Sequence, residues 1–226
     1  LQRGYDQFIH DVCLENIDVT FAIDRAGIVG EDGPTHTGSF DISFMRCIPN
    51  IVISCPSNEH ELWHLLNICY EHKGPAAIRY PRGSGIGVKP IPNEIEGFEI
   101  GKAKKIKDGQ SVCILNFGVL MDQIDQIAEK KNYTLYDMRF IKPIDEDALE
   151  HAMQHETIIT LEDNTLLGGC GSAVGEKLHK QKFKGNLLSI GLKDEFPAHG
   201  SRNEILRQNG LDEESIQKTI DDFLRN

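Results

Sequence analysis

The stretch that decides the fold runs from Val19 to Gly27 and reads VTFAIDRAG. It begins with a short apolar run, Val19–Ile23, of the kind that forms a strand buried on both faces in a parallel sheet. The run leads directly into a polar, glycine-rich segment that continues to Gly38 and is too long for a simple turn. Ligands bind beyond the carboxyl ends of such strands, and a long loop at that place is usually functional. The stretch therefore predicts an α/β fold with a candidate site between residues 24 and 38.

Strand and helix patterns alternate on both sides of this stretch. Residues 5–13 carry apolar side chains at the spacing of an amphipathic helix, and another helix starts near Pro56. Further strands are predicted at 51–54, 76–80, 112–116, 134–138, 157–161 and 187–191, and further helices at 120–130, 144–153, 170–180, 202–208 and from Asp212 onward. The inward faces of the helix near Pro56 and of the last helix are expected to comprise Leu62, Leu65, Leu66 and Cys69, and Ile216, Ile220, Phe223 and Leu224, respectively. Alternation at this spacing forms βαβ units and parallel sheets.

The chain divides into two units. Between residues 83 and 109 the helical period is lost and Gly, Pro, Lys and Glu dominate, which predicts a linker with room for one short hairpin. We therefore expect one α/β unit at 1–85, a linker at 86–109 and a second α/β unit at 110–226.

The net charge argues against binding to nucleic acid but allows a small phosphorylated substrate. The 226 residues include 24 basic and 35 acidic side chains, which gives a formal net charge of −11. Nucleic-acid binders need clustered Lys and Arg, whereas a small phosphorylated substrate needs only a few well-placed cations. The six cysteines are scattered, with no CxxC pair and no Cys/His spacing of a metal site. They predict reduced thiols in an intracellular protein.

The hydropathy and the start of the chain carry two further expectations. No apolar run approaches the roughly 18–20 residues that a membrane helix requires. The chain has no signal peptide and begins at Leu1, without Met, directly in a helical pattern. We therefore expect it to be part of a longer polypeptide.

The loop after Val19–Ile23 holds a candidate acid–base residue, His36. Its glycines let the backbone approach a ligand closely, and histidine exchanges protons near neutral pH. The alternative is a solvated histidine on a flexible loop, and spacing alone favours that alternative.

Two arginines at strand ends form a candidate anion site. Arg25 follows the first strand, and Arg82 follows the strand at 76–80. A guanidinium group binds phosphate or carboxylate through two parallel hydrogen bonds. The alternative pairs each arginine with a local carboxylate such as Asp24 or Glu31, and the residue pattern leaves both alternatives open.

A glycine-rich segment, Gly168–Gly175, lies between a predicted strand and a predicted helix. Its glycine spacing differs from the GxGxxG of dinucleotide sites, and no acidic residue ends the next strand, so close packing of helix on strand is the favoured interpretation. Glu162 and Asp163 precede it and are expected to form an acidic helix cap or a contact between units. The polar face of the helix near Pro56 is expected to carry His60, His64 and His72.

Five short stretches carry a family resemblance. They lie at residues 1–7, 22–38, 46–49, 78–83 and 137–143. The His-Thr-Gly element at 36–38 is shared by the wider transketolase group. The combination of DRAG at 24–27 with RYPRG at 79–83 resembles the 1-deoxy-D-xylulose-5-phosphate synthase family. The similarity runs over essentially the whole chain.

This resemblance implies an activity. Members of the family are homodimeric transferases that depend on thiamine diphosphate and Mg²⁺. They join pyruvate to D-glyceraldehyde 3-phosphate with loss of CO₂, which supplies isoprenoid, thiamine and pyridoxal synthesis in the bacterial cytoplasm or in plastids. The resemblance implies that Arg3, Arg25 and Arg82 bind substrate, with Arg25 and Arg82 holding the triose phosphate. It also implies that His36 and Asp32 are the catalytic side chains.

The resemblance also assigns the two units. Residues 1–85 resemble the latter part of a pyrimidine-binding domain, and residues 110–226 resemble a transketolase C-terminal domain. The ligands of thiamine diphosphate and Mg²⁺ are expected in an N-terminal portion upstream, so we expect no cofactor or metal ligand in these residues. The first unit would then lack its opening strands and expose a sheet edge that a partner completes. This chain alone is expected neither to bind thiamine diphosphate tightly nor to turn over.

Two other functions remain open at this level. A β-subunit of a 2-oxoacid dehydrogenase has the same two domains on a separate chain; it predicts a lipoyl-domain partner and no triose-phosphate site. A dimerisation module without activity is the non-enzyme alternative, and the second unit fits it because its sequence has no convincing catalytic constellation.

Overall fold

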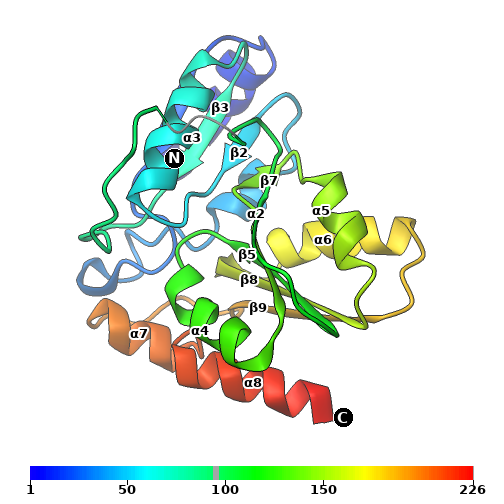
Figure 1. Ribbon diagram of the computed structural model, residues 1–226. Coiled ribbons are helices and arrows are strands. Elements are labelled where there is room, and N and C mark those ends of the chain that lie inside the picture. The colour runs from blue at the N-terminus through cyan, green and yellow to red at the C-terminus, as the bar shows by residue number, and fades with distance from the viewer. Residues whose placement is uncertain (94–96, 226) are drawn as a thin grey trace.

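The molecule contains a four-stranded sheet and a five-stranded sheet that lie side by side (Figure 1). The structure, a computed structural model, describes residues 1–93 and 97–225. The strand orders are β1-β3-β2-β7 in the first sheet and β4-β6-β5-β8-β9 in the second. All neighbours pair in parallel except β7, which is antiparallel to β2, and β4, which is antiparallel to β6. The strands are β1 (Thr20–Ile23), β2 (Val52–Ser54), β3 (Ala76–Arg79), β4 (Lys104–Lys107), β5 (Val112–Phe117), β6 (Thr134–Asp137), β7 (Phe140–Lys142), β8 (Thr157–Thr165) and β9 (Asn186–Leu192).

Helices cover both faces of both sheets. In the first half, α3 packs on one face, and the N-terminal helical segment and α2 pack on the other. In the second half, α4, α7 and α8 cover one face, and α5 and α6 cover the other (Figure 1). The helical elements are η1 (Gln2–Gly4), α1 (Tyr5–Gln7), the π-helical η2 (Phe8–Cys13), η3 (Gly30–Asp32), α2 (Asp41–Met45), α3 (Glu59–Glu71), α4 (Met121–Lys131), α5 (Glu146–Ala152), α6 (Cys170–Lys180), α7 (Arg202–Gln208) and α8 (Glu213–Arg225).

This architecture confirms the predicted α/β class with two mostly parallel sheets. Besides the short helical turns η1 and η3, the elements α2, β4 and β7 were not predicted. Strand β4 lies within the expected linker 86–109, of which residues 94–96 fall outside the described residues. Strand β7 belongs to the second half of the sequence but pairs with β2 of the first sheet, with Ser54 opposite Phe140 and Ile53 opposite Lys142.

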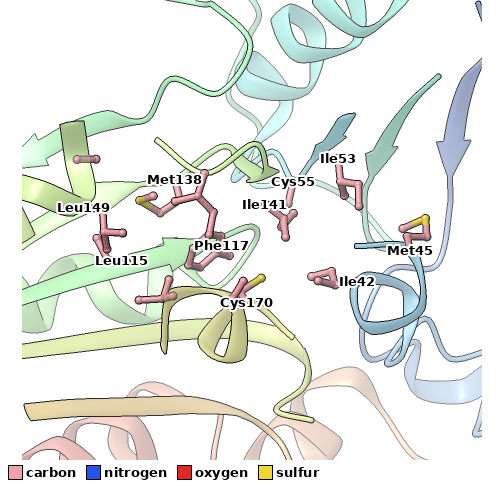
Figure 2. Packing of buried hydrophobic residues seen from close by; sticks show 14 of the residues in the cluster. Ile42, Met45, Ile53, Cys55, Leu115, Phe117, Met138, Ile141, Leu149 and Cys170 are labelled. Atoms are coloured by element: carbon pink, nitrogen blue, oxygen red, sulfur yellow. The ribbon is translucent and has the colours of Figure 1, made fainter. Parts of the chain in front are cut away.

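One hydrophobic cluster joins the two halves. Figure 2 shows Ile42 and Ile53 of the first half facing the same interior as Phe117 and Cys170 of the second. All four side chains are fully buried. Buried apolar surface stabilises by about 25 cal/mol per Å². Because elements of both sheets contribute to this cluster, its burial holds the two halves against each other.

Helix α3 is buried on a face that was predicted to be polar. His60 and His64 are buried, and the ring of Phe98 lies over both, with centroid distances of 5.7 and 4.3 Å. Of the three histidines expected on the polar face of this helix, His60 and His64 are therefore buried, because Phe98, far along the chain, folds back over α3, while His72 is half-buried. Two side chains that were predicted to point inward are instead 40% exposed, Leu66 and Leu224.

The glycine-rich segment packs α6 tightly onto the second sheet. A Cβ on Gly171 would lie 2.4 Å from Ser189 Oγ and 2.8 Å from Thr160 Oγ1, which confirms the close-packing interpretation. Glu162 accepts hydrogen bonds from the backbone N–H groups of Cys170 and Gly171, both at 2.8 Å, and so caps the N-terminus of α6. Burial raises the pKa of Glu162 to about 7, although these two bonds act in the opposite direction.

All six cysteines are free, and all except Cys47 are buried. Within residues 1–93 and 97–225, no helix combines the length and the apolar character needed to cross a membrane.

Candidate functional site

The candidate site lies where β1 and β3 end. Arg25 follows β1 with a φ of 66°, which is uncommon for a residue other than glycine. The side chain of Asp24 stabilises this conformation, because Oδ1 accepts a hydrogen bond from the backbone N–H of Arg25 at 2.7 Å. Asp24 Oδ2 also lies 2.6 Å from Arg25 Nη1. The loop thus presents the Arg25 guanidinium at the strand end.

Arg25 and Arg82 converge on one carboxylate, that of Asp32. Arg25 Nε lies 3.1 Å from Asp32 Oδ2, and Arg82 Nη1 lies 2.9 Å from Asp32 Oδ1. The two arginine side chains are 40% and 43% exposed. The two arginines therefore meet beyond neighbouring strand ends, and each is paired with a carboxylate, as the second alternative expected. Binding of an anion by these arginines stays a prediction. Ion pairs this exposed contribute about 0–1 kcal/mol, and the exposed parts of both guanidinium groups remain open to an incoming anion.

Two cavities lie beside these arginines, one lined by Arg25 and the other by Arg82. One, of about 570 Å³, is lined by Arg3, Arg25 and His36, which the structure therefore brings together. The other, of about 920 Å³, is lined by Arg82 and by side chains of both halves. Asp24 lines both cavities. The ring Nδ1 of His36 lies 2.9 Å from the hydroxyl oxygen of Thr35, and the imidazole is exposed.

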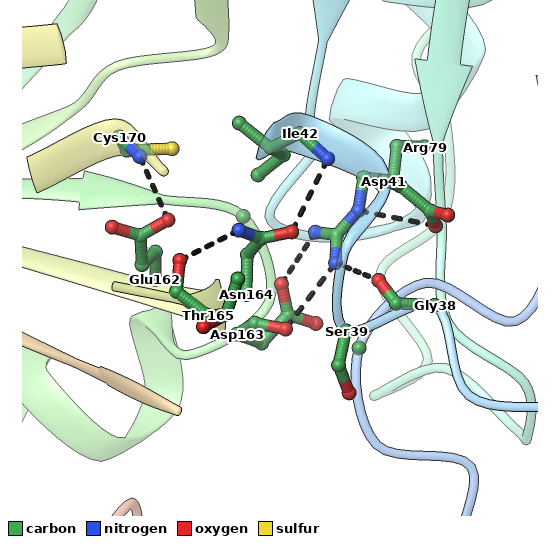
Figure 3. A network of polar contacts seen from close by, with 12 residues as sticks. Gly38, Ser39, Asp41, Ile42, Arg79, Glu162, Asp163, Asn164, Thr165 and Cys170 are labelled. Carbon is green, nitrogen blue, oxygen red and sulfur yellow. Dashed lines mark hydrogen bonds and ion pairs between the residues drawn. The ribbon is translucent and has the colours of Figure 1, made fainter. Parts of the chain in front are cut away.

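A buried arginine behind the first cavity was missed by the sequence analysis. Arg79 ends β3 and donates from Nη1 to Asp163 Oδ1 at 2.6 Å and from Nη2 to the carbonyl of Gly38 at 2.9 Å (Figure 3). Its Nε lies 3.6 Å from Asp41 Oδ2. Asp163 thus makes a contact between the two halves, which was one of the two roles expected for it. The available signal was the charge itself, because an arginine in an otherwise buried strand requires a buried partner.

Asp41 connects this buried network to the cavity of His36. Its side chain lines that cavity, and Oδ2 is buried without a hydrogen-bond partner among the described residues. Burial raises the pKa of Asp41 to about 6, and the nearby guanidinium of Arg79 acts in the opposite direction. Burial therefore makes Asp41 easier to protonate than an ordinary aspartate, at the wall of the cavity that His36 lines.

Both halves of the chain match models of known domains. Residues 1–86 match the transketolase pyrimidine binding domain, and residues 101–216 match the transketolase C-terminal domain.

Curated relatives with the same name match the chain along its whole length. The chain is 50% identical over 226 residues to the 1-deoxy-D-xylulose-5-phosphate synthase of Idiomarina loihiensis. It is 51% identical over 226 residues to the corresponding protein of Mannheimia succiniciproducens. In both cases the match covers 100% of this chain and 36% of the relative, so the chain spans about a third of the relatives' length.

A solved structure described as "Split gene transketolase, inactive beta4 tetramer" has the same fold. It superposes with a TM-score of 0.86 at 24% identity, over 97% of this chain and 71% of that one. The domain matches, the relatives and this fold agree with the motifs at the strand ends. The chain therefore belongs to the transketolase family, within which its sequence matches the 1-deoxy-D-xylulose-5-phosphate synthases.

Proposed function

We propose that this chain forms the substrate-side wall of a 1-deoxy-D-xylulose-5-phosphate synthase. The enzyme would join pyruvate to D-glyceraldehyde 3-phosphate with loss of CO₂, and its product would feed isoprenoid, thiamine and pyridoxal synthesis. The observation that carries the proposal is the convergence of Arg25 and Arg82 on Asp32. Two guanidinium groups at neighbouring strand ends suit the dianionic phosphate of the triose.

Each candidate residue has a proposed task. Arg25 and Arg82 bind the phosphate of the triose, and Asp32 holds the two guanidinium groups at the spacing this requires. Arg3 binds the substrate from the N-terminal segment, since it lines the same cavity as Arg25. His36 contacts the substrate oxygens, where an imidazole can exchange a proton with the hydroxyl group formed in the carbon–carbon bond-forming step.

The cofactors belong to another portion of the enzyme in this proposal. Thiamine diphosphate, when bound, supplies the carbon centre that retains the electron pair released with CO₂. A magnesium–diphosphate site needs several oxygen ligands. Within residues 1–93 and 97–225, no group of three or more His, Cys, Asp or Glu is arranged to hold a metal ion. On the family resemblance, we assign the thiamine diphosphate and Mg²⁺ ligands to an N-terminal portion, and we call this chain together with that portion the complete synthase.

The organisation of the complete synthase follows from the same proposal. Residues 1–85 form the latter part of the pyrimidine-binding domain, residues 86–109 a linker and residues 110–226 the C-terminal domain. The N-terminal portion is the partner of this chain, two copies of the synthase form a dimer, and the enzyme works in the bacterial cytoplasm or in a plastid. This chain alone would neither bind thiamine diphosphate tightly nor decarboxylate pyruvate.

The decisive experiment separates the two half-reactions. In the complete synthase, Arg82→Ala is expected to abolish condensation with D-glyceraldehyde 3-phosphate while CO₂ release from pyruvate persists. Arg207→Ala is the matched control, because Arg207 is an exposed arginine of α7 that lines neither cavity.

Three outcomes would contradict the proposal. Equal loss of both half-reactions in Arg82→Ala would remove the phosphate-binding role. Acyl transfer to a lipoyl domain, without triose condensation, would identify a 2-oxoacid dehydrogenase subunit. Decarboxylation of pyruvate by this chain alone would show that the cofactor ligands are not confined to the N-terminal portion.

A further inference from the structure

Two hydrogen bonds attach the segment that follows His36 to strand β8 of the second half. Asn164 of β8 accepts a hydrogen bond from the backbone N–H of Ile42 through Oδ1 at 3.2 Å. The backbone N–H of Thr165 donates to the carbonyl of Ser39 at 2.7 Å. Figure 3 shows this end of β8 facing the loop. These bonds fix the backbone at Ser39 and Ile42, shortly after His36, against a buried strand.

Asp163 holds the same loop through Arg79. The guanidinium of Arg79 lies between Asp163 and the carbonyl of Gly38, and it contacts Asp163 through both the carboxylate and the backbone carbonyl, at 2.6 and 3.2 Å. The Arg79 and Asp163 side chains are 1% and 4% exposed. Because a buried guanidinium must stay paired, movement of Asp163 moves the donor to Gly38, two residues after His36.

Asp163 also limits the position of the loop that carries Arg25. A Cβ on Gly27 would lie 2.2 Å from Asp163 Oδ2, so only glycine fits there, and the φ of Gly27 is 66°. The carbonyl of Gly27 accepts a hydrogen bond from the backbone N–H of Gly38 at 3.1 Å. A Cβ on Gly38 would in turn lie 2.3 Å from the carbonyl oxygen of Arg25. The two loops are therefore packed on each other and on Asp163.

We propose that Asp163, together with Asn164 beside it, is a positioning residue for the substrate site. The two side chains belong to the second half of the molecule, and they set the relative placement of the loops that carry Arg25 and His36. This inference rests on the proposed function for what the site binds, but the attachment itself is independent of the reaction. The C-terminal half thus contributes to the active site rather than serving as a dimerisation module alone.

The first test removes one negative charge without changing side-chain size. In Asp163→Asn, Arg79 keeps Asp41 as a counter-charge, so the buried guanidinium is not left unpaired. Asn164→Ala is a second, uncharged variant that removes the bond to Ile42. Glu176→Gln is the matched control. It weakens another ion pair between the halves, in which Arg46 Nη2 lies 2.5 Å from Glu176 Oε1 at the surface.

Amide hydrogen exchange of the complete synthase measures directly how firmly residues 35–42 are held against the second half. In Asp163→Asn and Asn164→Ala, peptides covering residues 35–42 are expected to exchange faster, while peptides covering β5 keep the wild-type rate. Glu176→Gln is expected to leave both unchanged. Unchanged exchange at 35–42 in both variants would overturn the proposal, as would acceleration that is equal throughout the molecule, because that pattern reports only lost stability.

Kinetic measurements on the complete synthase test whether displacement of these residues lowers kcat. A displacement of about 1 Å in a site costs up to about 100-fold in rate. We expect Asp163→Asn to lower kcat about 10- to 100-fold at temperatures where the protein is folded, with a smaller change in the KM for pyruvate. A kcat within about twofold of wild type would overturn the proposal. If the wild-type synthase itself lacks this activity, the proposed function fails, while the exchange measurement still decides the positioning role.

Discussion

Arg79 and Asp163 form a buried ion pair between the two halves of the chain, with 2.6 Å between Nη1 and Oδ1. Removing Arg79 would leave the carboxylates of Asp163 and Asp41 in the interior without their cation. Breaking a buried pair costs roughly 3–5 kcal/mol. We therefore expect Arg79→Met to lower the free energy of unfolding by about that amount in urea denaturation. Arg82→Met, which affects an arginine that is 43% exposed, should cost less than about 1 kcal/mol. Equal losses in the two variants would contradict this account.

Asp32 is expected to affect substrate binding more than stability. Its two ion pairs, to Arg25 and Arg82, involve partly exposed side chains and contribute about 1 kcal/mol or less each. In Asp32→Asn the two guanidinium groups lose the carboxylate that holds them together. We expect the KM for D-glyceraldehyde 3-phosphate of the complete synthase to rise about tenfold, which corresponds to about 1.4 kcal/mol. A lower KM would show that Asp32 competes with the phosphate instead of positioning its ligands.

Asp137 is expected to make stability fall as pH rises. Burial, followed by the charge of Glu61, raises the pKa of Asp137 from 3.8 to about 7. The folded state therefore binds this proton more tightly than the unfolded state. The resulting stabilisation is complete below the unfolded pKa and is lost as pH rises through about 7. It amounts to on the order of 4 kcal/mol.

The variant Asp137→Asn removes this titration while keeping the side chain that meets Ser57 Oγ, which lies 2.6 Å from Asp137 Oδ2. Urea unfolding between about pH 4.5 and 7.5 should show a smaller decline in stability for the variant than for the wild type. Other buried acids, such as Glu162, still titrate, so the decline is reduced rather than abolished. Parallel curves for the two proteins would contradict the assignment.

Two glycines of α6 provide opposite predictions. Gly171→Ala would place a Cβ 2.4 Å from Ser189 Oγ, and such overpacking costs about 1–3 kcal/mol. Gly175→Ala would meet only Leu187 Cδ2 at 3.4 Å, so the variant should gain up to about 1 kcal/mol from its better helix propensity. Thermal unfolding of the two variants decides between them. Equal stability of Gly171→Ala and Gly175→Ala would contradict the close packing of α6 against the sheet at Gly171.

The sequence predicted the elements whose signal is local. Buried strands such as β5 are continuous apolar runs, and amphipathic helices such as α4 follow the helical period. The missed strands lack that signal. Strand β4 is the lysine-rich edge Lys104–Lys107, and charged edge strands carry no apolar pattern. Strand β7 has three residues, and its partner β2 lies far away in the sequence.

The candidate site, like the fold, could be predicted from the sequence only in part. Arg25 and Arg82 were predictable because each follows a strand in the sequence and parallel strands end at one edge. Their meeting at Asp32 was not, because it depends on the path of the intervening loop. The pair of Arg79 with Asp163 spans 84 positions, and only the packing of the two halves brings it together.

The crossing of β7 into the first sheet makes the linker a poor place to divide the gene. A fragment that stops within residues 86–109 would keep β2 but lose the antiparallel strand beside it (Figure 1). It would also lose Arg139, whose Nε lies 2.7 Å from Glu61 Oε2 of α3, and so leave that buried acid unpaired. A chimera that exchanges C-terminal halves between related enzymes must therefore match Glu61 and β2 of its new host, even though neither belongs to the exchanged segment.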